Sequence, residues 1–509
     1  MYQPVIGLEI HVELNTKSKM FCGCANDSDE HHPNILICPT CLGHPGSLPV
    51  INKEAVRKTI KTGLSLNCQI PEYSKFDRRL YFYPDLPKGY QISQWKEPLC
   101  KGGFLEIEGK KIRIKEIHLE EDVGRLVHER DYNPPTASSR AKGAGPYSLV
   151  DFNRAGVPLM ELDTEPDMRS AKEARKFAEE LQLIVRYLGV SSAFMEKGEM
   201  RCDANISLTK TKKLGTKVEI KNLNSFKAIE QGLEYEIKRQ TEILNSGEKI
   251  TQETRGWDDD RGVTVPQREK GEAIFSPEPN LPILHLGVAD YINEIRAEIP
   301  ELPRQRRERF KKEYHLDEKS IEIFVQNKDF GEYFEKVVSE FGPRLSQEKL
   351  SGLIKLATNY LITDLQGLLK GASVTRVKRR VKMNERSSTV GEDFLITPEN
   401  FAEFITLIYT GAISSKIAKQ VLAEMFSTGA DPSHIIEEKG LSQITDEAEI
   451  GKIIKEVISK NPKAVQDFKK GKETAIQFLI GQIMAQTKGK ANPKIVKDIL
   501  NKQLTPTPN

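Results

Sequence analysis

The spacing of hydrophobic residues changes along this chain, and that change limits the possible fold more than any other feature. Up to about residue 224, short runs alternate apolar and polar residues between Gly, Pro and Asn, as strands of a largely antiparallel sheet do. The clearest runs are residues 5–14, 111–122, 200–208 and 216–223. Prolines then cluster within residues 276–282, where they disfavour both helix and central strand. Beyond about residue 290 the spacing is helical.

These patterns predict an α+β protein in three parts. Residues 1–290 form a mixed domain, residues 291–397 an all-α domain, and residues 398–509 a separate all-α C-terminal domain. The second boundary follows from residues 370–398, where Gly, Ser, Thr and basic residues interrupt the amphipathic pattern. Three parts also suit a chain of 509 residues, which exceeds what one hydrophobic core usually serves.

One helix is expected inside the mixed domain, over residues 170–188. It begins with Ser170 and Glu173 in the arrangement of a capping box. Its apolar residues share one face: Phe177, Leu181, Ile184, Val185 and Leu188.

Composition excludes several classes of protein. Hydrophobic residues at 38% and charged residues at 29% are typical of a globular chain, neither disordered nor embedded in a membrane. No apolar run approaches the roughly 18 residues of a spanning helix, and the N-terminus lacks a basic region followed by an apolar core, so we expect a cytoplasmic protein. A net charge of +3 does not by itself indicate nucleic-acid binding, and any RNA contact must come from local patches.

The strand at residues 5–14 carries a polar face. Its even positions are all apolar, so Glu9, His11 and Glu13 share the opposite face. Residues two apart on a strand lie about 7 Å from each other, close enough for Glu9 and His11 to converge on one cation. The alternative is a solvated sheet face without function.

The alternation of apolar and polar residues changes phase within residues 111–122. Apolar positions are even at Ile112 and Ile114 but odd at Ile117 and Leu119, which indicates a β-bulge near residues 115–116. The odd face continues to Glu121, and a buried carboxylate needs a cation. Alternatively, the strand ends at Leu119 and the acidic triplet that follows is a solvated turn.

A hairpin is expected from residues 200–208 and 216–223. Arg201, Asp203 and Asn205 share the polar face of its first strand. Lys217, Glu219 and Lys221 share that of its second strand, and the two faces adjoin. Such a surface suits binding of metal and phosphate together, although an exposed hairpin with cross-strand ion pairs has the same pattern.

Four of the seven cysteines lie in one short window. Cys22 and Cys24 precede Cys38 and Cys41 by thirteen residues, a spacing typical of a tetrahedral zinc knuckle in a reducing compartment. Four thiolates leave no open position on the metal, so the predicted Zn²⁺ is structural rather than catalytic. The alternatives are reduced free cysteines or a redox pair.

Familiar nucleotide-binding motifs are missing. The chain has no GxxxxGK[ST] loop and no GxGxxG turn, so any nucleotide site is of another kind. Residues 144–154, with Ser148 and Asp151, combine small and polar side chains in a possible phosphate cradle. An ordinary loop leading into a strand is the alternative.

Several stretches, taken in order, resemble the family of B subunits of the aspartyl/glutamyl-tRNA amidotransferases. The resemblance covers nearly the full length of the chain. The matching stretches are residues 6–14, 45–50, 74–78, 81–85, 90–94, 118–122, 201–208, 221–226, 414–419 and 488–493.

The resemblance implies a cradle-shaped N-terminal domain and a ligase activity that uses glutamine as amide donor. ATP and Mg²⁺ serve to phosphorylate the side-chain carboxylate of glutamate on tRNA(Gln), or of aspartate on tRNA(Asn). The glutaminase partner, or A subunit, supplies ammonia through a tunnel, the small C subunit joins the two, and the tail domain holds tRNA by its shape.

The resemblance also implies site residues. The cation is held by residues that match Glu9, His11, Glu121 and Glu219, which favours Glu121 over Glu120. Candidates for binding ATP and substrate, several of which stabilise charge on the moving phosphoryl group, are Lys75, Ser148, Asp151, Arg201, Asp203, Lys217 and Lys221.

The chain departs from the family in two places. Residues 273–276 read Ala-Ile-Phe-Ser where members carry Tyr-Arg-Tyr-Phe, so an arginine is lost, although Arg268 and Lys270 are nearby. Residues 375–382 are unusually basic, as an extra RNA contact or a solvated helix face would be. These departures leave a tRNA-binding module without chemistry as a second hypothesis. A stand-alone metallohydrolase is a third, but the chain shows no activated-water signature beyond the one mixed carboxylate and histidine site.

Overall fold

The computed structural model describes residues 2–27, 30–128, 148–211, 213–267, 273–342, 345–369, 395–441, 447–469, 473–487, 490–491 and 493–504. The chain divides into two compact units, Met1–Pro303 and Arg304–Asn509. The first unit combines strands with helices, and every named element after residue 288 is a helix, so the α+β prediction is confirmed.

A mixed sheet forms the centre of the first unit. Its strand order is β14-β13-β12-β11-β1-β10-β7-β5, with β6 paired to β7. Neighbouring strands are antiparallel except β12 and β13. The bounds are β1 Gln3–Glu13, β5 Cys100–Lys101, β6 Phe104–Ile107, β7 Lys110–Glu121, β10 Pro158–Thr164, β11 Met200–Thr209, β12 Val218–Leu223, β13 Glu253–Asp258 and β14 Val263–Pro266.

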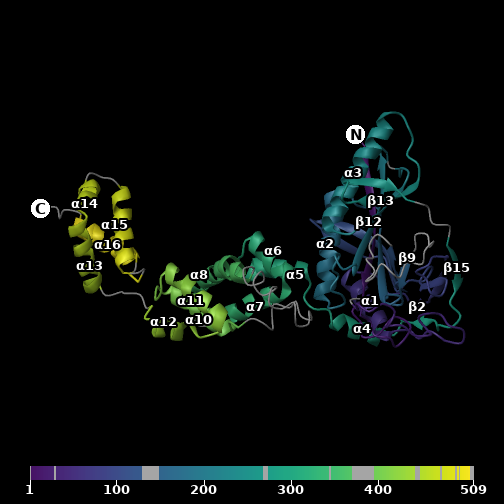
Figure 1. Cartoon of the computed structure of the whole chain (residues 1–509), viewed down its shortest axis with the longest axis horizontal. Coiled ribbons are helices and arrows are strands. Elements are labelled where there is room, and N and C mark those ends of the chain that lie inside the picture. Colours follow the sequence, from purple (N-terminus) through teal and green to yellow (C-terminus); the bar gives the residue numbers. More distant parts are fainter. Residues whose placement is uncertain are drawn as a thin grey trace, which may run out of the picture. The chain divides into compact units, whose positions relative to one another are not determined.

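Helices cover the apolar face of this sheet. Helices α2 (Ala171–Tyr187) and α3 (Phe226–Asn245) lie beside the strands in Figure 1. Phe177 and Leu181 of α2 join the even positions of β1 in one buried core. The core keeps these helices on one face of the sheet, so the opposite face of the central strands is left to polar residues.

The capping box predicted for α2 is present in modified form. The Ser170 hydroxyl accepts a hydrogen bond from the backbone N–H of Glu173. The Glu173 carboxylate accepts from the N–H of Arg169, one residue before the cap. Both bonds satisfy N–H groups that the helix itself leaves unpaired.

The predicted bulge in β7 is also confirmed. Asp163 of β10 pairs with Glu116, whereas the next residue, Thr164, pairs with Ile114. Lys115 is therefore the extra residue, and the apolar core residues move from even positions, Ile112 and Ile114, to odd positions, Ile117 and Leu119, beyond it.

The proline-rich segment contributes to a small three-stranded sheet. Its first residues, Ser276 and Pro277, belong to an edge strand, β15 (Ile274–Pro277), which pairs with β3 (Asp77–Leu80), and β3 in turn pairs with β4 (Tyr90–Ser93). Proline is tolerated there because an edge strand has one unpaired side. The first unit continues to Pro303 and not only to residue 290.

Smaller elements complete the first unit. Helix α1 contacts both β7 and α4. The remaining bounds are α1 Lys53–Ser65, α4 Ala289–Ala297, β2 Tyr73–Ser74 paired with β16 Leu284–His285, and β8 Arg125–His128 paired with β9 Ser148–Asp151.

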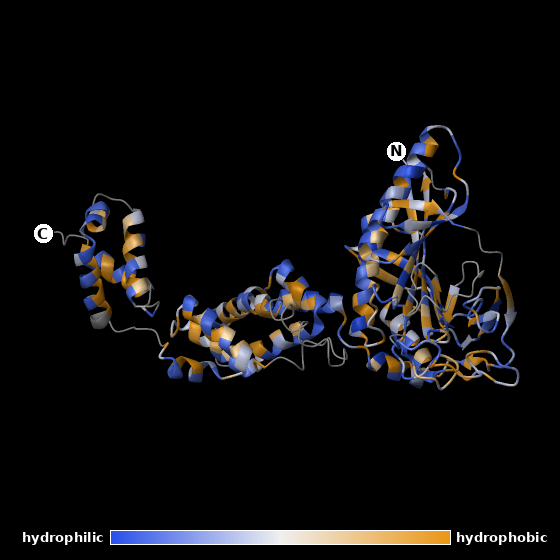
Figure 2. Cartoon of the chain, viewed as in Figure 1, coloured by the Kyte–Doolittle hydropathy of each residue, from blue (hydrophilic) through white to orange (hydrophobic). Residues whose placement is uncertain are grey.

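The second unit contains two groups of amphipathic helices, whose hydrophobic and hydrophilic residues are distinguished in Figure 2. Phe310, Phe324 and Phe334 pack together in the first group. Ile454, Leu479 and Leu500 belong to a separate core in the second. The first group is α5 Pro303–Glu313, α6 Glu318–Gln326, α7 Lys328–Ser339, α8 Gln347–Asn359, η3 Tyr360–Leu365, α10 Pro398–Tyr409, α11 Ser415–Thr428 and α12 Pro432–Glu438. The second is α13 Glu447–Lys460, α14 Pro462–Lys469, α15 Glu473–Gln486 and α16 Pro493–Leu504.

Two predictions for this part of the chain fall largely or wholly outside the described residues. These are the domain boundary near residue 397 and the basic segment 375–382. Over the described ranges, no helix combines the length and apolar character needed to cross a membrane.

We predict that Phe177→Ala destabilises the first unit by about 3–5 kcal/mol, because Phe177 is fully buried and its loss leaves a cavity. Urea unfolding followed by circular dichroism measures the change. Phe82→Ala deletes the same atoms at a side chain that is 92% exposed, so equal losses in the two variants would contradict the assigned core.

Candidate functional site

The register of three central strands aligns ionisable residues on the polar sheet face. His11 of β1 lies opposite Glu161 of β10 and Arg201 of β11. Glu9, two residues earlier, lies opposite Asp163 and Asp203. Residues that face each other across antiparallel strands have Cβ atoms about 5 Å apart. The pairing therefore brings side chains from distant parts of the sequence into one group.

His11 is the centre of this group. Its Nε2 lies 3.7 Å from a Glu9 carboxylate oxygen, 3.6 Å from one of Glu161 and 3.8 Å from one of Glu120. Glu9, His11 and Glu161 offer ligand atoms within 4.8 Å of one another. Two carboxylates and an imidazole fit a divalent cation, so these residues form a candidate metal centre.

Burial and like charges shift the pKa values in this group. Burial, with the charge of Glu161, raises the pKa of Glu9 to about 7. Burial alone would lower the pKa of His11, but its interaction with Glu161 and the charges of Glu120 and Glu9 raise it to about 9. Burial also raises the pKa of Glu120 to about 7. Such crowding of carboxylates favours a bound cation.

A second set of possible ligands adjoins the first on the same face. Glu116, His118 and Asp163 also place ligand atoms within 4.8 Å of one another. His118 Nδ1 lies 2.7 Å from the Gln94 carbonyl oxygen, which fixes the orientation of the ring. Its Nε2 is 3.4 Å from a Glu116 carboxylate oxygen.

A cavity of about 210 Å³ opens over this face, and we call it the Glu9 cavity. Arg79 and Arg201 both line it. Each has a buried Nε–H without a hydrogen-bond partner among the described residues, a feature that suits an anionic ligand. The residues that line it include Glu9, His11, Arg79, Tyr81, Glu120, Asp122, Arg201, Asp203 and Lys221.

Glu121 does not join Glu9 and His11. Both of its carboxylate oxygens accept hydrogen bonds from Lys88 Nζ at 2.5 Å, and one also accepts from the Ile92 N–H at 2.8 Å. The expectation that buried Glu121 needs a cation is confirmed, but the cation is the Lys88 ammonium. Adjacent strand residues face opposite ways, so Glu120, and not Glu121, is the neighbour of His11 in this structure.

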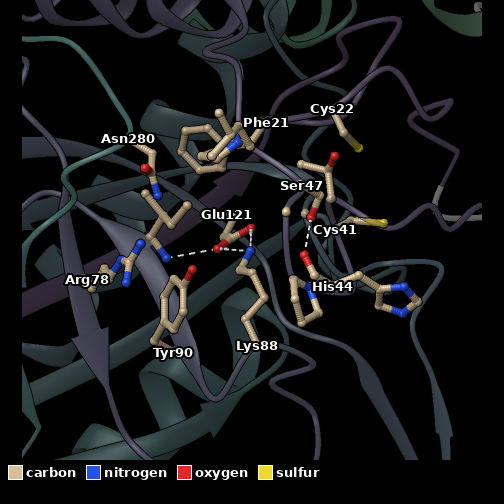
Figure 3. A pocket seen from close by; sticks show the side chains of 18 residues that line it. Phe21, Cys22, Cys41, His44, Ser47, Arg78, Lys88, Tyr90, Glu121 and Asn280 are labelled. Atoms are coloured by element: carbon tan, nitrogen blue, oxygen red, sulfur yellow. Dashed lines mark hydrogen bonds and ion pairs between the residues drawn. The ribbon is translucent and has the colours of Figure 1, made fainter.

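Glu121 lines a different cavity, of about 240 Å³, between the clustered cysteines and the sheet formed by β15, β3 and β4 (Figure 3). Its carboxylate points toward Lys88, near Tyr90 and Arg78. Arg78 in turn donates two hydrogen bonds to the buried carboxylate of Glu278.

The predicted hairpin residues have different positions relative to the Glu9 cavity. Lys221 Nζ lies 2.9 Å from carboxylate oxygens of both Asp203 and Glu219, so the two polar faces adjoin as expected. Arg201 is bonded to Asp122 at 2.7 Å. Glu219 accepts from the Thr254 hydroxyl and is paired with Lys221, but it is not part of the described cavity lining.

Four other predicted residues are not part of the described cavity lining: Lys75, Lys217, Ser148 and Asp151. Lys217 is exposed, and so is Ser148 in β9. The Asp151 carboxylate accepts from the backbone N–H groups of Asn34 and Asn153, so it organises a loop. Of the expected phosphate cradle, residues 144–147 lie outside the described ranges, as do Arg268 and Lys270.

Sequence reasoning missed several residues of the site, above all Glu161, whose carboxylate lies beside His11. The signal was present in β10, where Met160, Leu162 and Thr164 are buried and Glu161 and Asp163 alternate with them. Arg79 had a weaker signal, since it lies opposite Phe275 of β15 only after two distant strands pair. Phe275 stacks on Trp95 with ring centroids 4.1 Å apart.

The four clustered cysteines converge as their spacing predicted. Sulfur atoms of Cys22, Cys24, Cys38 and Cys41 lie within 4.8 Å of one another. A hydrogen bond from Cys22 lowers the pKa of Cys41 to about 5. The Cys38 N–H also donates to the Cys41 sulfur at 3.1 Å. This arrangement fits a tetrahedral Zn²⁺ site.

Two family models match the chain. Residues 4–291 match the model described as GatB/GatE catalytic domain, and residues 333–504 match the model described as GatB domain. The first unit, with its mixed sheet and polar site, therefore belongs to the class of GatB/GatE catalytic domains. The helices that follow it include a GatB domain.

Similar proteins with known names identify the family more narrowly. The chain is 48% identical over 512 residues to the B subunit of the aspartyl/glutamyl-tRNA(Asn/Gln) amidotransferase of Thermotoga maritima, covering 99% of each. Proteins of the same name from Dehalococcoides mccartyi and Carboxydothermus hydrogenoformans are 46% and 45% identical, again over 99% of each chain. The chain belongs to the family of aspartyl/glutamyl-tRNA(Asn/Gln) amidotransferase B subunits.

We predict that Glu161→Gln weakens Mn²⁺ binding at least about tenfold, because it removes a charged ligand beside His11. Electron paramagnetic resonance of free Mn²⁺ measures the affinity. Glu121→Gln makes the same chemical change at the Lys88 pair and leaves the affinity unaltered. A larger loss from Glu121→Gln than from Glu161→Gln would refute the assignment.

We also predict that Mn²⁺ binds more tightly as the pH rises from about 6 to about 8. Glu9, with a pKa of about 7, and His11, with a pKa of about 9, hold protons below those values. The cation must displace these protons, so its affinity increases up to about tenfold per pH unit for each proton released. Isothermal titration calorimetry in two buffers of different ionisation heat counts the protons, and an affinity independent of pH contradicts these ligands.

Proposed function

We propose that this chain is the carboxylate-activating component of a tRNA-dependent amidotransferase. Its substrates are glutamate on tRNA(Gln), aspartate on tRNA(Asn), or both, with ATP as phosphoryl donor and glutamine as the source of the amide nitrogen. The names of the relatives support the reaction. The observation that carries it is the Glu9 cavity, where acidic ligands for a cation adjoin arginines with unpartnered Nε–H groups.

The chemistry explains why such a site is needed. A carboxylate resists attack by ammonia because its oxygen is a poor leaving group. One oxygen of the substrate carboxylate attacks the γ-phosphorus of ATP, the bond from that phosphorus to ADP breaks, and an acyl phosphate forms. Ammonia then displaces phosphate, and the products are the amide and inorganic phosphate. The first step brings two anions together, so positive charge must surround both.

Glu9, His11 and Glu161 are the proposed ligands for Mg²⁺, with Glu120 next to them. The bound ion would offset repulsion between the phosphates and the substrate carboxylate. Glu121 and Glu219, which the family resemblance implies as further ligands, contact Lys88 and Lys221 instead. Their participation would require both contacts to change.

Three cationic side chains are proposed to hold the phosphates. Arg201 is oriented by the Asp122 carboxylate, and its Nε–H has no hydrogen-bond partner among the residues that the structure describes. Lys221 is fixed by Asp203 and Glu219 on the other side. Arg79 supplies a third cation. It lines the cavity together with Ala273, which belongs to the segment from which the family's arginine is missing. The arginines can each form paired hydrogen bonds to phosphate oxygens, which lysine cannot.

The proposal includes partners. The glutaminase, or A subunit, would release ammonia, the small C subunit would join the complex, and the helical unit would contact the tRNA. The four clustered cysteines are proposed to hold a structural Zn²⁺, because four converging sulfurs fit that ion and leave no open position for chemistry.

We predict that Glu9→Gln reduces ATP cleavage stimulated by misacylated tRNA at least about 100-fold, because the cation loses a ligand in the transition state. The assay uses the chain purified with its partner subunits, Glu-tRNA(Gln), ATP and glutamine, and measures ADP and Gln-tRNA(Gln). Glu234→Gln, at an exposed position of α3, is the matched control and keeps full activity. ATP cleavage that does not depend on misacylated tRNA would instead refute the proposed function.

A further inference from the structure

Lys19 is a fully buried lysine outside the Glu9 cavity. Its Nζ donates to the carbonyl oxygens of Leu36 at 2.7 Å, Ala155 at 2.7 Å and Phe152 at 3.4 Å. Three acceptors satisfy the three N–H bonds of the ammonium group. No carboxylate pairs with it among the described residues, yet a buried charge without an opposite charge is strongly unfavourable.

The cysteine cluster lies close to Lys19 and is a source of negative charge when it binds zinc. Lys19 and Cys41 pack against the same glycine, since a Cβ added at Gly156 would lie 3.4 Å from Lys19 Cδ and 3.6 Å from Cys41 Cβ. The Lys19 N–H also donates to the Cys24 carbonyl. A zinc ion with four thiolates carries a net charge of −2, which would compensate the buried ammonium.

The acceptors of Lys19 belong to two segments that are far apart in the sequence. Leu36 lies between the two cysteine pairs, whereas Phe152 and Ala155 lie in the segment 150–156. Asn34 and Asn153 connect the same segments, since the Asn34 amide donates to Val150 O and accepts from the Phe152 N–H. Asn153 accepts from the Leu36 N–H and donates to His32 O.

Segment 150–156 in turn holds a wall of the Glu9 cavity. The Gly156 N–H donates to the Asp122 carbonyl at 2.9 Å. Arg154 donates to the Val123 carbonyl and lies 3.5 Å from the Asp122 carboxylate. Asp122 is the residue that orients Arg201. A continuous set of contacts therefore joins the cysteine cluster to a proposed phosphate-binding arginine.

We infer that Lys19 is a positioning residue that compensates the charge of the zinc-loaded cysteine cluster and ties it to segment 150–156, so that zinc occupancy keeps this wall of the phosphate site ordered. The inference rests on the proposed zinc site. It gives the metal a role in the geometry of a cavity that it does not line.

The test uses the chain purified with its partner subunits and has two readouts besides activity. Competition with a chromophoric chelator gives the zinc affinity, and hydrogen exchange gives the protection of amides in residues 150–156. Lys19→Met keeps the length of the side chain but removes its charge. We expect it to weaken zinc binding about tenfold or more and to increase exchange in residues 150–156, but not in α3. Lys19→Arg keeps the charge and stays closer to the wild type in both readouts.

Zinc removal from the wild-type chain needs no substitution, and it must produce the same local increase in exchange. The inference is overturned if Lys19→Met binds zinc as tightly as the wild type, or if the zinc-free chain keeps its protection in residues 150–156. A wild-type chain that binds no zinc would refute the metal assignment itself, a failure that the metal content reveals before any variant is made.

Discussion

The antiparallel pairing of β1 with both β10 and β11 is the constraint on which the site depends. This register places His11 opposite Glu161 and Arg201, and Glu9 opposite Asp163 and Asp203. A shift of β1 by one residue would turn Glu9 and His11 into the core and bring apolar residues of β1 to the cavity. The core residues Ile6, Leu8, Ile10 and Val12 therefore fix the position of the polar ones, because they bury one face of β1 completely.

The same register brings together carboxylates that disfavour each other. Burial and neighbouring acids raise the pKa values of Glu9, Glu13 and Glu120. Such a group is unfavourable for the fold alone, and a bound cation would stabilise it by binding only the folded state. The arginines at the edge of the cavity have the complementary property, since their unpartnered Nε–H groups favour an anion. A cation and an anion bound together would satisfy both, as carboxylate phosphorylation with ATP requires.

Local pattern was enough to predict β1, the bulge in β7, the hairpin of β11 and β12, the cap of α2 and the converging cysteines. In each of these the informative residues are close in the sequence or share one strand. The site itself was only partly predictable because it depends on pairing between distant strands. Glu161 becomes a neighbour of His11 through β10, and Arg79 joins the cavity through β3. Whether Glu120 or Glu121 lies beside His11 depends on a single step along β7. Lys88, more than thirty residues earlier, accounts for the buried position of Glu121.

We propose that phosphoryl transfer from ATP to a side-chain carboxylate takes place in the Glu9 cavity. Glutamate labelled with ¹⁸O in its side-chain carboxylate, attached to tRNA(Gln), tests this directly when mass spectrometry follows the label through one turnover of the complex. We expect one labelled oxygen in the released phosphate for the wild type, and no transfer above background for Glu9→Gln. Phosphate without label from an active wild-type complex, or equal transfer by both proteins, would contradict it.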